Sequence, residues 1–155
     1  MRISRDQMYM QMARAASQRS TCFRASVGAI LVEDRRKVLS IGYNGPAAGE
    51  PHCTGHVCSR EGQGCHRSLH AEANALDMAG KSVGLLTMYC THSPCSVCAR
   101  AMKQRGVSRV VYEQEYRDRT PVDWMIECGM TVHRLSPSGY LIDAETKELV
   151  NDEGA

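Results

Sequence analysis

The stretch LLTMYCTHSPCSVCARAMKQRGVSRVVYE, residues 85–113, decides the fold. Apolar runs of strand type, 85–91 and 107–113, lie at its two ends. Residues 95–105 between them have helical spacing and follow Pro94, which suits the first position of a helix because proline lacks an N–H. The stretch therefore predicts a strand, a helix and a second strand.

The same alternation continues on both sides of this stretch. Two apolar runs separated by a charged turn, residues 33–37, indicate a β-hairpin near the N-terminus. The expected elements outside 85–113 are helices 5–18, 70–79 and 121–128, and strands 27–32, 38–43 and 129–135. The apolar face expected for the first helix consists of Met8, Met12, Ala15 and Ala16.

This order of elements predicts an α/β fold. Alternating strands and helices favour a three-layer α/β/α sandwich, with helices on both faces of a central mixed sheet of about five strands. A length of 155 residues suits one domain with a substantial core. We expect the domain to span residues 1–135, and the polar residues 136–155 to form a C-terminal tail.

Charge and hydropathy exclude several classes of function. The formal net charge of +2 is too small for a nucleic-acid-binding face but suits a small anionic substrate. No run approaches the roughly 18 apolar residues that a membrane helix needs, so no membrane partner is expected. The basic N-terminus lacks the apolar region of a secretory signal, which favours a cytoplasmic protein.

Eight cysteines are unusual for such a chain. Six of them lie in polar surroundings with four histidines nearby. Cysteine mixed with histidine, in a chain without an export signal, favours metal binding over disulfides.

Cys95 and Cys98 form a Cys-x-x-Cys pair at the start of the helix expected after Pro94. Residues three apart share one face of a helical turn, and the positive helix end favours thiolates. A thioredoxin-like redox pair, or two ordinary cysteines, is the alternative to a metal site for this motif alone.

His70 and Glu72 favour a metal site over a redox pair or two ordinary cysteines. One histidine and two thiolates are a ligand set for zinc, and three protein ligands leave the fourth position open for water, as in catalytic sites. Glu72, two residues after His70, is placed to accept the proton of that water. A His-x-Glu followed by Pro-Cys-x-x-Cys is the signature of zinc nucleobase deaminases.

Further motifs indicate one branch of these zinc deaminases. They are STCFRASVGAI (20–30), GYNGPAAG (42–49), PHCTGHVC (51–58), CHRSLHAEANAL (65–76), THSPCSVCARAM (91–102) and VVYEQEYRD (110–118). With these motifs the chain resembles the deoxycytidylate (dCMP) deaminases of the small bacterial and phage type, within the cytidine deaminase superfamily. The resemblance covers residues 20–118 and implies hydrolytic deamination of dCMP to dUMP and ammonia, supplying dUMP for thymidylate synthesis.

The resemblance also assigns residues of a substrate site. It implies that Asn44 binds the deoxyribose, and that the backbone around Ala71 and Ser93 reads the cytosine edge. Tyr116 would line the pocket for base or sugar. The candidates for phosphate contacts are Arg24 and Arg117. The chain departs from the common family pattern where Pro46 follows Gly45 directly, so we expect this loop to approach the phosphate differently.

A second, structural zinc is expected in the long irregular segment 44–68, which has little apolar content to hold it. Cys22 lies in the STCFR stretch, where the family places a ligand. The proposed ligands are Cys22, Cys53, Cys65 and, as the fourth, Cys58, with His56 or His66 as alternatives.

Regulation and assembly are implied by the resemblance alone. Many family members are homo-hexamers that dCTP activates and dTTP inhibits, with Mg²⁺ on the bound triphosphate. We therefore expect a homo-oligomer that takes a nucleotide substrate.

Three other functions stay open on the sequence alone. The same zinc chemistry serves tRNA adenosine deaminases and deaminases of free nucleosides or bases. A zinc-stabilised accessory protein of DNA uptake, without turnover, is the alternative from another class. Glu72 argues against it, because a purely structural site needs no general base.

Overall fold

The computed structural model describes residues 1–53, 65 and 67–151. Its helices are α1 (Arg5–Ser17), α2 (Ala71–Met78), α3 (Ser96–Gln104) and α4 (Thr120–Glu127). Its strands are β1 (Gly28–Glu33), β2 (Lys37–Tyr43), β3 (Leu86–His92), β4 (Val107–Gln114), β5 (Thr131–Leu135), β6 (Leu141–Asp143) and β7 (Leu149–Val150). Each helix and strand expected from the sequence is present, with ends displaced by at most two residues.

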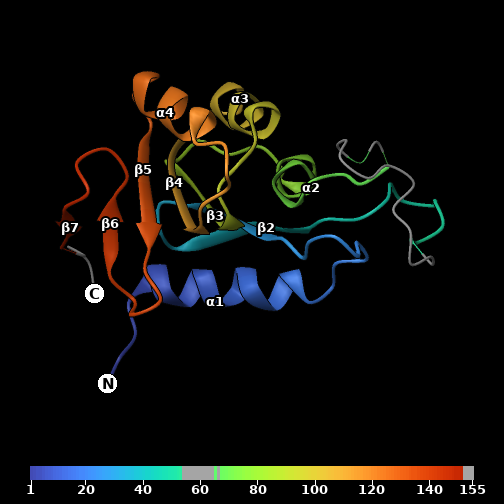
Figure 1. Ribbon diagram of the computed structural model, residues 1–155, viewed down its shortest axis with the longest axis horizontal. Coiled ribbons are helices and arrows are strands. Elements are labelled where there is room, and N and C mark those ends of the chain that lie inside the picture. The colour runs from blue at the N-terminus through green and yellow to red at the C-terminus, as the bar shows by residue number, and fades with distance from the viewer. Residues whose placement is uncertain (54–64, 66, 152–155) are drawn as a thin grey trace.

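The described strands form one mixed sheet in the order β2-β1-β3-β4-β5-β6-β7. β3, β4 and β5 are parallel, whereas the hairpin β1–β2 and the last strands pair antiparallel. Helix α1 covers one face of the sheet, and α2, α3 and α4 cover the other (Figure 1). The three-layer α/β/α sandwich is therefore confirmed.

The expected number of about five strands is wrong, because the described residues alone form a sheet of seven. The two additional strands, β6 and β7, come from the polar tail after residue 135. They are three and two residues long, too short for an alternating hydrophobic pattern to reveal them.

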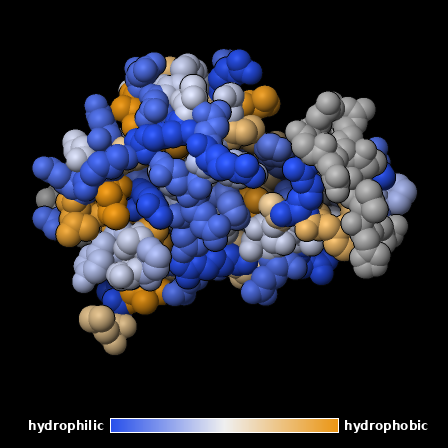
Figure 2. All heavy atoms as spheres, in the orientation of Figure 1, coloured by the Kyte–Doolittle hydropathy of each residue, from blue (hydrophilic) through white to orange (hydrophobic). Residues whose placement is uncertain are grey.

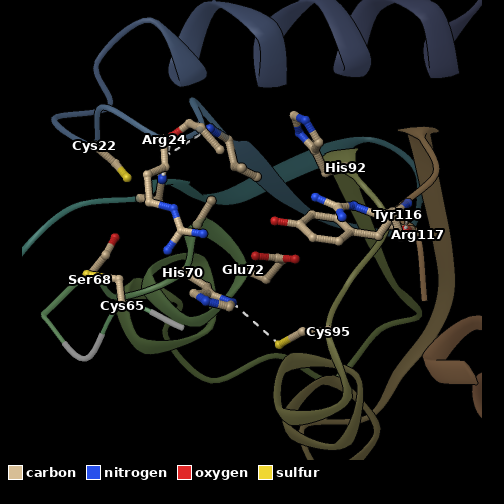
Figure 3. Close-up of a pocket in the computed structure, with 15 residues that line it drawn as sticks. Cys22, Arg24, Cys65, Ser68, His70, Glu72, His92, Cys95, Tyr116 and Arg117 are labelled. Carbon is tan, nitrogen blue, oxygen red and sulfur yellow. Dashed lines mark hydrogen bonds between the residues drawn. The ribbon is translucent and has the colours of Figure 1, made fainter. Parts of the chain in front are cut away.

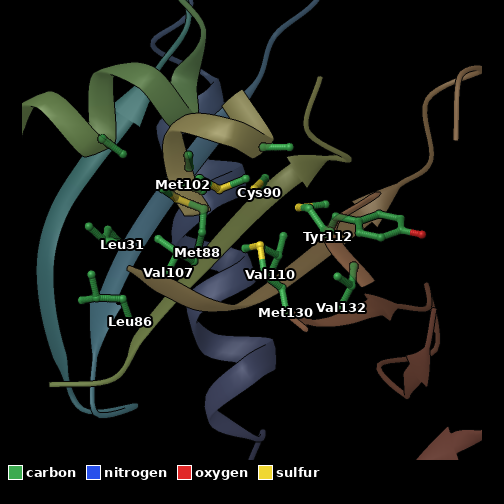
Figure 4. Packing of buried hydrophobic residues seen from close by; sticks show 14 of the residues in the cluster. Leu31, Leu86, Met88, Cys90, Met102, Val107, Val110, Tyr112, Met130 and Val132 are labelled. Atoms are coloured by element: carbon green, nitrogen blue, oxygen red, sulfur yellow. The ribbon is translucent and has the colours of Figure 1, made fainter. Parts of the chain in front are cut away.

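Two hydrophobic clusters hold the three layers together. The larger one fills the space between the sheet and α2–α4, where Met88, Val110 and Met102 are fully buried (Figure 4). The smaller one lies between the sheet and α1 and is centred on Met10, Ile30 and Tyr89. Strands β1 and β3 contribute to both clusters, which explains why β1 is buried along its whole length and β3 up to its last residue.

Two glycines allow helices to approach the sheet closely. A Cβ atom on Gly28 would overlap the carbonyl oxygen of Ala13 in α1. A Cβ on Gly42 would overlap the carbonyl oxygen of Ala71 and lie 2.6 Å from the backbone nitrogen of Ala75. Any larger residue at position 42 would push the first turn of α2 away from β2.

The buried face of α1 differs from the one expected. Asp6, Tyr9, Met10, Ala13 and Ala16 face the sheet, whereas Met8 is 40% exposed. The expectation failed because it followed apolar residues only, and the inward face carries a carboxylate. This carboxylate, Asp6, is fully buried.

Asp6 joins α1 to the sheet through a network of charged hydrogen bonds. Arg109 of β4 donates to it at 2.8 and 3.2 Å, the Tyr89 hydroxyl donates at 2.6 Å, and Arg35 donates at 3.2 Å. Burial opposes ionisation, but the hydrogen bonds and charge of Arg109 outweigh it and hold the pKa of Asp6 below its ordinary value of 3.8. Asp6 is therefore an ionised, fully partnered anchor of α1.

We expect Asp6→Asn to lower the free energy of unfolding by about 3 kcal/mol, because Arg109 then stays buried without its counter-charge. The exposed Asp77→Asn variant serves as the control.

Because the folded pKa of Asp6 is depressed, its stabilising contribution is complete above pH 3.8 and is lost as pH falls through the folded value. Urea unfolding at pH 7 and at about pH 2 measures both effects, and a loss below about 1 kcal/mol at pH 7, typical of an exposed pair, would contradict this account.

No helix among the described residues is long and apolar enough to cross a membrane. The face of the molecule seen in Figure 2 is largely polar, and its apolar areas are small and separated. Isolated apolar residues of this kind are normal on a protein surface.

Candidate active site

The site forms where the N-termini of two helices meet, at the carboxyl end of β3. Helix α2 begins directly after His70, and α3 begins directly after Cys95. Strand β3 ends at His92, three residues before Cys95. Both helices direct the positive ends of their dipoles at the same place, which favours anionic ligands and thiolates there.

The position of His70 depends on a short bridge to the end of β2. Gly45 and Leu69 exchange two backbone hydrogen bonds, at 3.2 and 2.8 Å. His70 is then the N-cap of α2, but its side chain makes no capping hydrogen bond. Its imidazole turns instead toward the start of α3.

His70, Cys95 and Cys98 form the cluster that the sequence predicts. The Nδ1 atom of His70 lies 3.4 Å from the Sγ atom of Cys95 and 3.5 Å from that of Cys98. All three potential ligand atoms lie within 4.8 Å of one another, and no second group of this kind occurs among the described residues. One nitrogen and two sulfurs are a donor set that suits zinc and leaves one position open.

The electrostatics of the cluster favour a bound cation. The hydrogen bonds from Cys98 and from His70 lower the pKa of Cys95 to about 3, so this sulfur is already a thiolate. The hydrogen bond to Cys95 and burial raise the pKa of Cys98. The two thiols cannot both ionise easily beside each other without a metal ion, and a divalent cation removes this conflict.

Glu72 is the second residue of α2, with its carboxylate directed into the pocket near His70 (Figure 3). Its side chain is almost fully buried. Burial raises the pKa of Glu72 to about 7, opposed by a backbone hydrogen bond and by the charge of His70. A carboxyl group with this pKa can accept and release protons near neutral pH.

His70 and Cys95 of the cluster, together with Glu72, line a pocket of about 400 Å³. Most of the residues that the sequence analysis selects line it: Cys22, Arg24, Asn44, Cys65, His70, Ala71, Glu72, Ser93, Cys95, Tyr116 and Arg117. The pocket therefore unites residues from five separate segments of the chain.

Asn44 and Ser93 also hold the walls of the pocket in place. The Asn44 side chain accepts a hydrogen bond from the backbone of Val27 at 2.9 Å and donates one to the carbonyl of Ala25 at 2.8 Å. The Ser93 hydroxyl accepts from the backbone of Tyr116 at 2.8 Å. Each of these polar groups keeps further hydrogen-bonding capacity for a ligand.

The residues expected for a second zinc are only partly brought together. Cys22 and Cys65 line the same pocket, whereas Cys53 does not. These three cysteines do not form a metal-binding group in the described part of the chain. The other candidates, Cys58, His56 and His66, lie outside the described residues.

His92, the last residue of β3, also lines the pocket beside Tyr116, although no sequence motif singled it out. Its ring centroid lies 6.1 Å from that of Tyr116, in an edge-on arrangement. Its position three residues before Cys95 could have indicated this, because the end of β3 has to lie close to the start of α3.

Comparison with known proteins places this geometry in a family. Residues 3–114 match the model of the cytidine and deoxycytidylate deaminase zinc-binding region. This range contains the complete His/Cys/Cys cluster and Glu72. Zinc is therefore the metal of the site.

Individual relatives agree with the family model. The chain is 35% identical to ComE operon protein 2 of Bacillus subtilis over 152 residues, covering 95% of this chain and 79% of that protein. It is 38% identical to the deoxycytidylate deaminase of Mycobacterium phage D29 over 125 residues, covering 71% and 94% of the two chains.

A solved structure extends the similarity to the fold. The dCMP deaminase of cyanophage S-TIM5, solved in complex with dCMP and dUMP, superposes with a TM-score of 0.74 at 35% identity and covers 86% of this chain and 98% of that one. The matched model, the shared fold and the arrangement of His70, Glu72, Cys95 and Cys98 show that this chain belongs to the cytidine and deoxycytidylate deaminase family.

Proposed function

We propose that the protein is a dCMP deaminase, which converts dCMP and water into dUMP and ammonia. The observation that carries the proposal is one pocket in which the buried Glu72 lies beside the His70/Cys95/Cys98 cluster and which Arg24 and Arg117 also line. The relatives from phages D29 and S-TIM5, named as deaminases of this nucleotide, support the choice of substrate.

His70, Cys95 and Cys98 are the proposed zinc ligands. When bound, zinc supplies an acidified water molecule for attack on the carbon that carries the exocyclic amine. Glu72 accepts a proton from this water and delivers it to the neighbouring ring nitrogen of the base. It then transfers a second proton to the departing amine, which leaves as ammonia.

The other wall residues orient the nucleotide. Asn44 binds the deoxyribose with the hydrogen-bonding capacity left after its contacts to residues 25 and 27. The backbone around Ala71 and Ser93 reads the cytosine edge. Tyr116 lines the part of the pocket that holds the base or the sugar. Arg24 and Arg117 bind the phosphate, to which guanidinium groups donate strong charged hydrogen bonds.

A substrate panel tests this choice. Zinc-loaded protein is assayed for ammonia release from dCMP, deoxycytidine, adenosine and tRNA under matched conditions. We expect dCMP to have the highest kcat/KM, and deoxycytidine to be poor because it lacks the phosphate. Faster release from adenosine or tRNA would assign the chain to another branch of the family.

We further propose a second, structural zinc held by Cys22, Cys53, Cys65 and Cys58, with His56 or His66 as the alternative fourth ligand. Cys22 and Cys65 line one pocket, and thiols of a reducing compartment serve metal sites rather than disulfides.

Metal analysis tests the second zinc. Protein purified without added zinc should contain about two zinc ions per chain, because a closed tetrahedral site binds tightly. We expect Cys53→Ser to retain about one, whereas Cys128→Ser retains both. A content of one that Cys53→Ser leaves unchanged would remove the second site.

Assembly and regulation are proposed from the family resemblance. They comprise a homo-hexamer, activation by dCTP, inhibition by dTTP and Mg²⁺ on the bound triphosphate. A second cavity of about 1180 Å³, between α2 and the segment after β2, is large enough for a nucleotide. We also propose a cytoplasmic location, a compartment in which cysteine thiols stay reduced.

A further inference from the structure

His92 is a half-buried histidine in the pocket wall that the proposed chemistry does not use. It is the last residue of β3, so the sheet fixes its backbone. In Figure 3 it lies on the side of the pocket toward α1, whereas Cys95 lies at the opposite side. His92 is therefore remote from the reacting end of the site and yet open to the same ligand.

Thr91 determines which nitrogen of the His92 ring carries the proton. The hydroxyl of Thr91 is buried and accepts a hydrogen bond from the backbone N–H of Gly28 at 3.1 Å. The same oxygen lies 3.1 Å from Nδ1 of His92. In the described part of the chain, Nδ1 is the acceptor available for the hydroxyl proton, and a buried hydroxyl proton without an acceptor is unfavourable. Nδ1 is therefore the acceptor, and the ring proton is on Nε2.

The charge state of His92 is set by its surroundings. Burial lowers the pKa of His92 below the ordinary value for histidine, against an opposing effect of the Glu113 carboxylate. Glu113 forms an ion pair with Arg14 of α1, so its charge is largely neutralised. At neutral pH the His92 ring is thus uncharged. Its Nε2–H is a hydrogen-bond donor in fixed orientation at the pocket wall.

The shape of the substrate indicates the group that this donor meets. In a pyrimidine nucleotide the phosphate is the end farthest from the reacting carbon of the base. Since zinc and Glu72 hold the reacting carbon, the phosphate has to lie toward the side of the pocket occupied by His92. Arg24 and Arg117, which line the same pocket, supply the positive charge that a phosphate needs there.

We propose that His92 is a specificity-determining residue, which donates a hydrogen bond from Nε2 to the 5′-phosphate and so distinguishes the nucleotide from the nucleoside. The inference rests on the proposed dCMP deaminase function. It adds to the two arginines a neutral donor whose direction is fixed by the Gly28–Thr91–His92 chain of hydrogen bonds.

Two variants separate the hydrogen bond of His92 from the space that its ring fills. His92→Leu removes the donor and replaces the ring with an apolar side chain, whereas His92→Gln retains an N–H near the position of Nε2. For each, we would measure kcat and KM with dCMP, kcat/KM with deoxycytidine, zinc content, and the Kd of dUMP by calorimetry. The dUMP titration reports phosphate binding without turnover.

We expect His92→Leu to raise the KM for dCMP and the Kd of dUMP about tenfold or more, as for loss of a hydrogen bond to a charged group. Its kcat, its zinc content and its kcat/KM with deoxycytidine should stay near those of the unaltered protein, and His92→Gln should recover much of the binding. Equal losses with dCMP and deoxycytidine, or no change with either, would overturn the role of His92. An unaltered protein inactive on dCMP would instead overturn the proposed function, and this inference with it.

Discussion

Glu72→Gln is expected to reduce kcat for dCMP deamination by at least about 10²–10⁴-fold, the range for removal of a general acid or base. The effect should lie at the upper end or beyond, because this one carboxyl group serves both proton transfers. Glutamine has nearly the same shape and size, so the fold and zinc content should be unchanged. Single-turnover rates together with metal analysis of the same sample measure both.

A matched control for this variant is Glu127→Gln, on the exposed last turn of α4. It makes the same chemical change outside the pocket and should leave kcat unchanged. Turnover by Glu72→Gln within about tenfold of the unaltered protein would contradict the assignment of Glu72 as acid and base.

Cys95→Ser is expected to reduce activity to the level of Glu72→Gln or below, by a different route. The Cys95 sulfur is the thiolate of the cluster, with a pKa of about 3, and serine provides no comparable anion. The variant should lose one zinc ion per chain, and with it the source of the nucleophile. Metal analysis and ammonia release on the same preparation test both parts.

Cys128→Ser is the control, since Cys128 is a partly exposed cysteine outside the cluster. It should retain both zinc and activity. A Cys95→Ser variant that keeps its full zinc content would show that the metal is held elsewhere, and the three-ligand assignment would be wrong.

Local pattern was enough to predict most of the fold. Proline before α3, and apolar runs in β3 and β4, are local signals, and these elements lie where they are expected. The face of α1 was missed because the burial of Asp6 depends on Arg109, which is distant in the sequence. A contact between residues so far apart has no periodic signal.

The zinc cluster was predictable because its ligands, too, form a pattern within a short stretch of sequence. His70 and the two cysteines are at the starts of two consecutive helices, and their spacing carries the pattern of the family. The role of His92 was not predictable, because it depends on Thr91 and Gly28 meeting across two paired strands. A single histidine near the end of a strand looks like many structural histidines.

The central claim is that this pocket deaminates dCMP with zinc and Glu72. Its most direct test is to incubate purified, zinc-loaded protein with dCMP and to quantify dUMP and ammonia in parallel with the Glu72→Gln variant. The account predicts equal amounts of dUMP and ammonia from the unaltered protein, and almost none from the variant. No dUMP from the zinc-loaded protein, or equal amounts from both proteins, would contradict it.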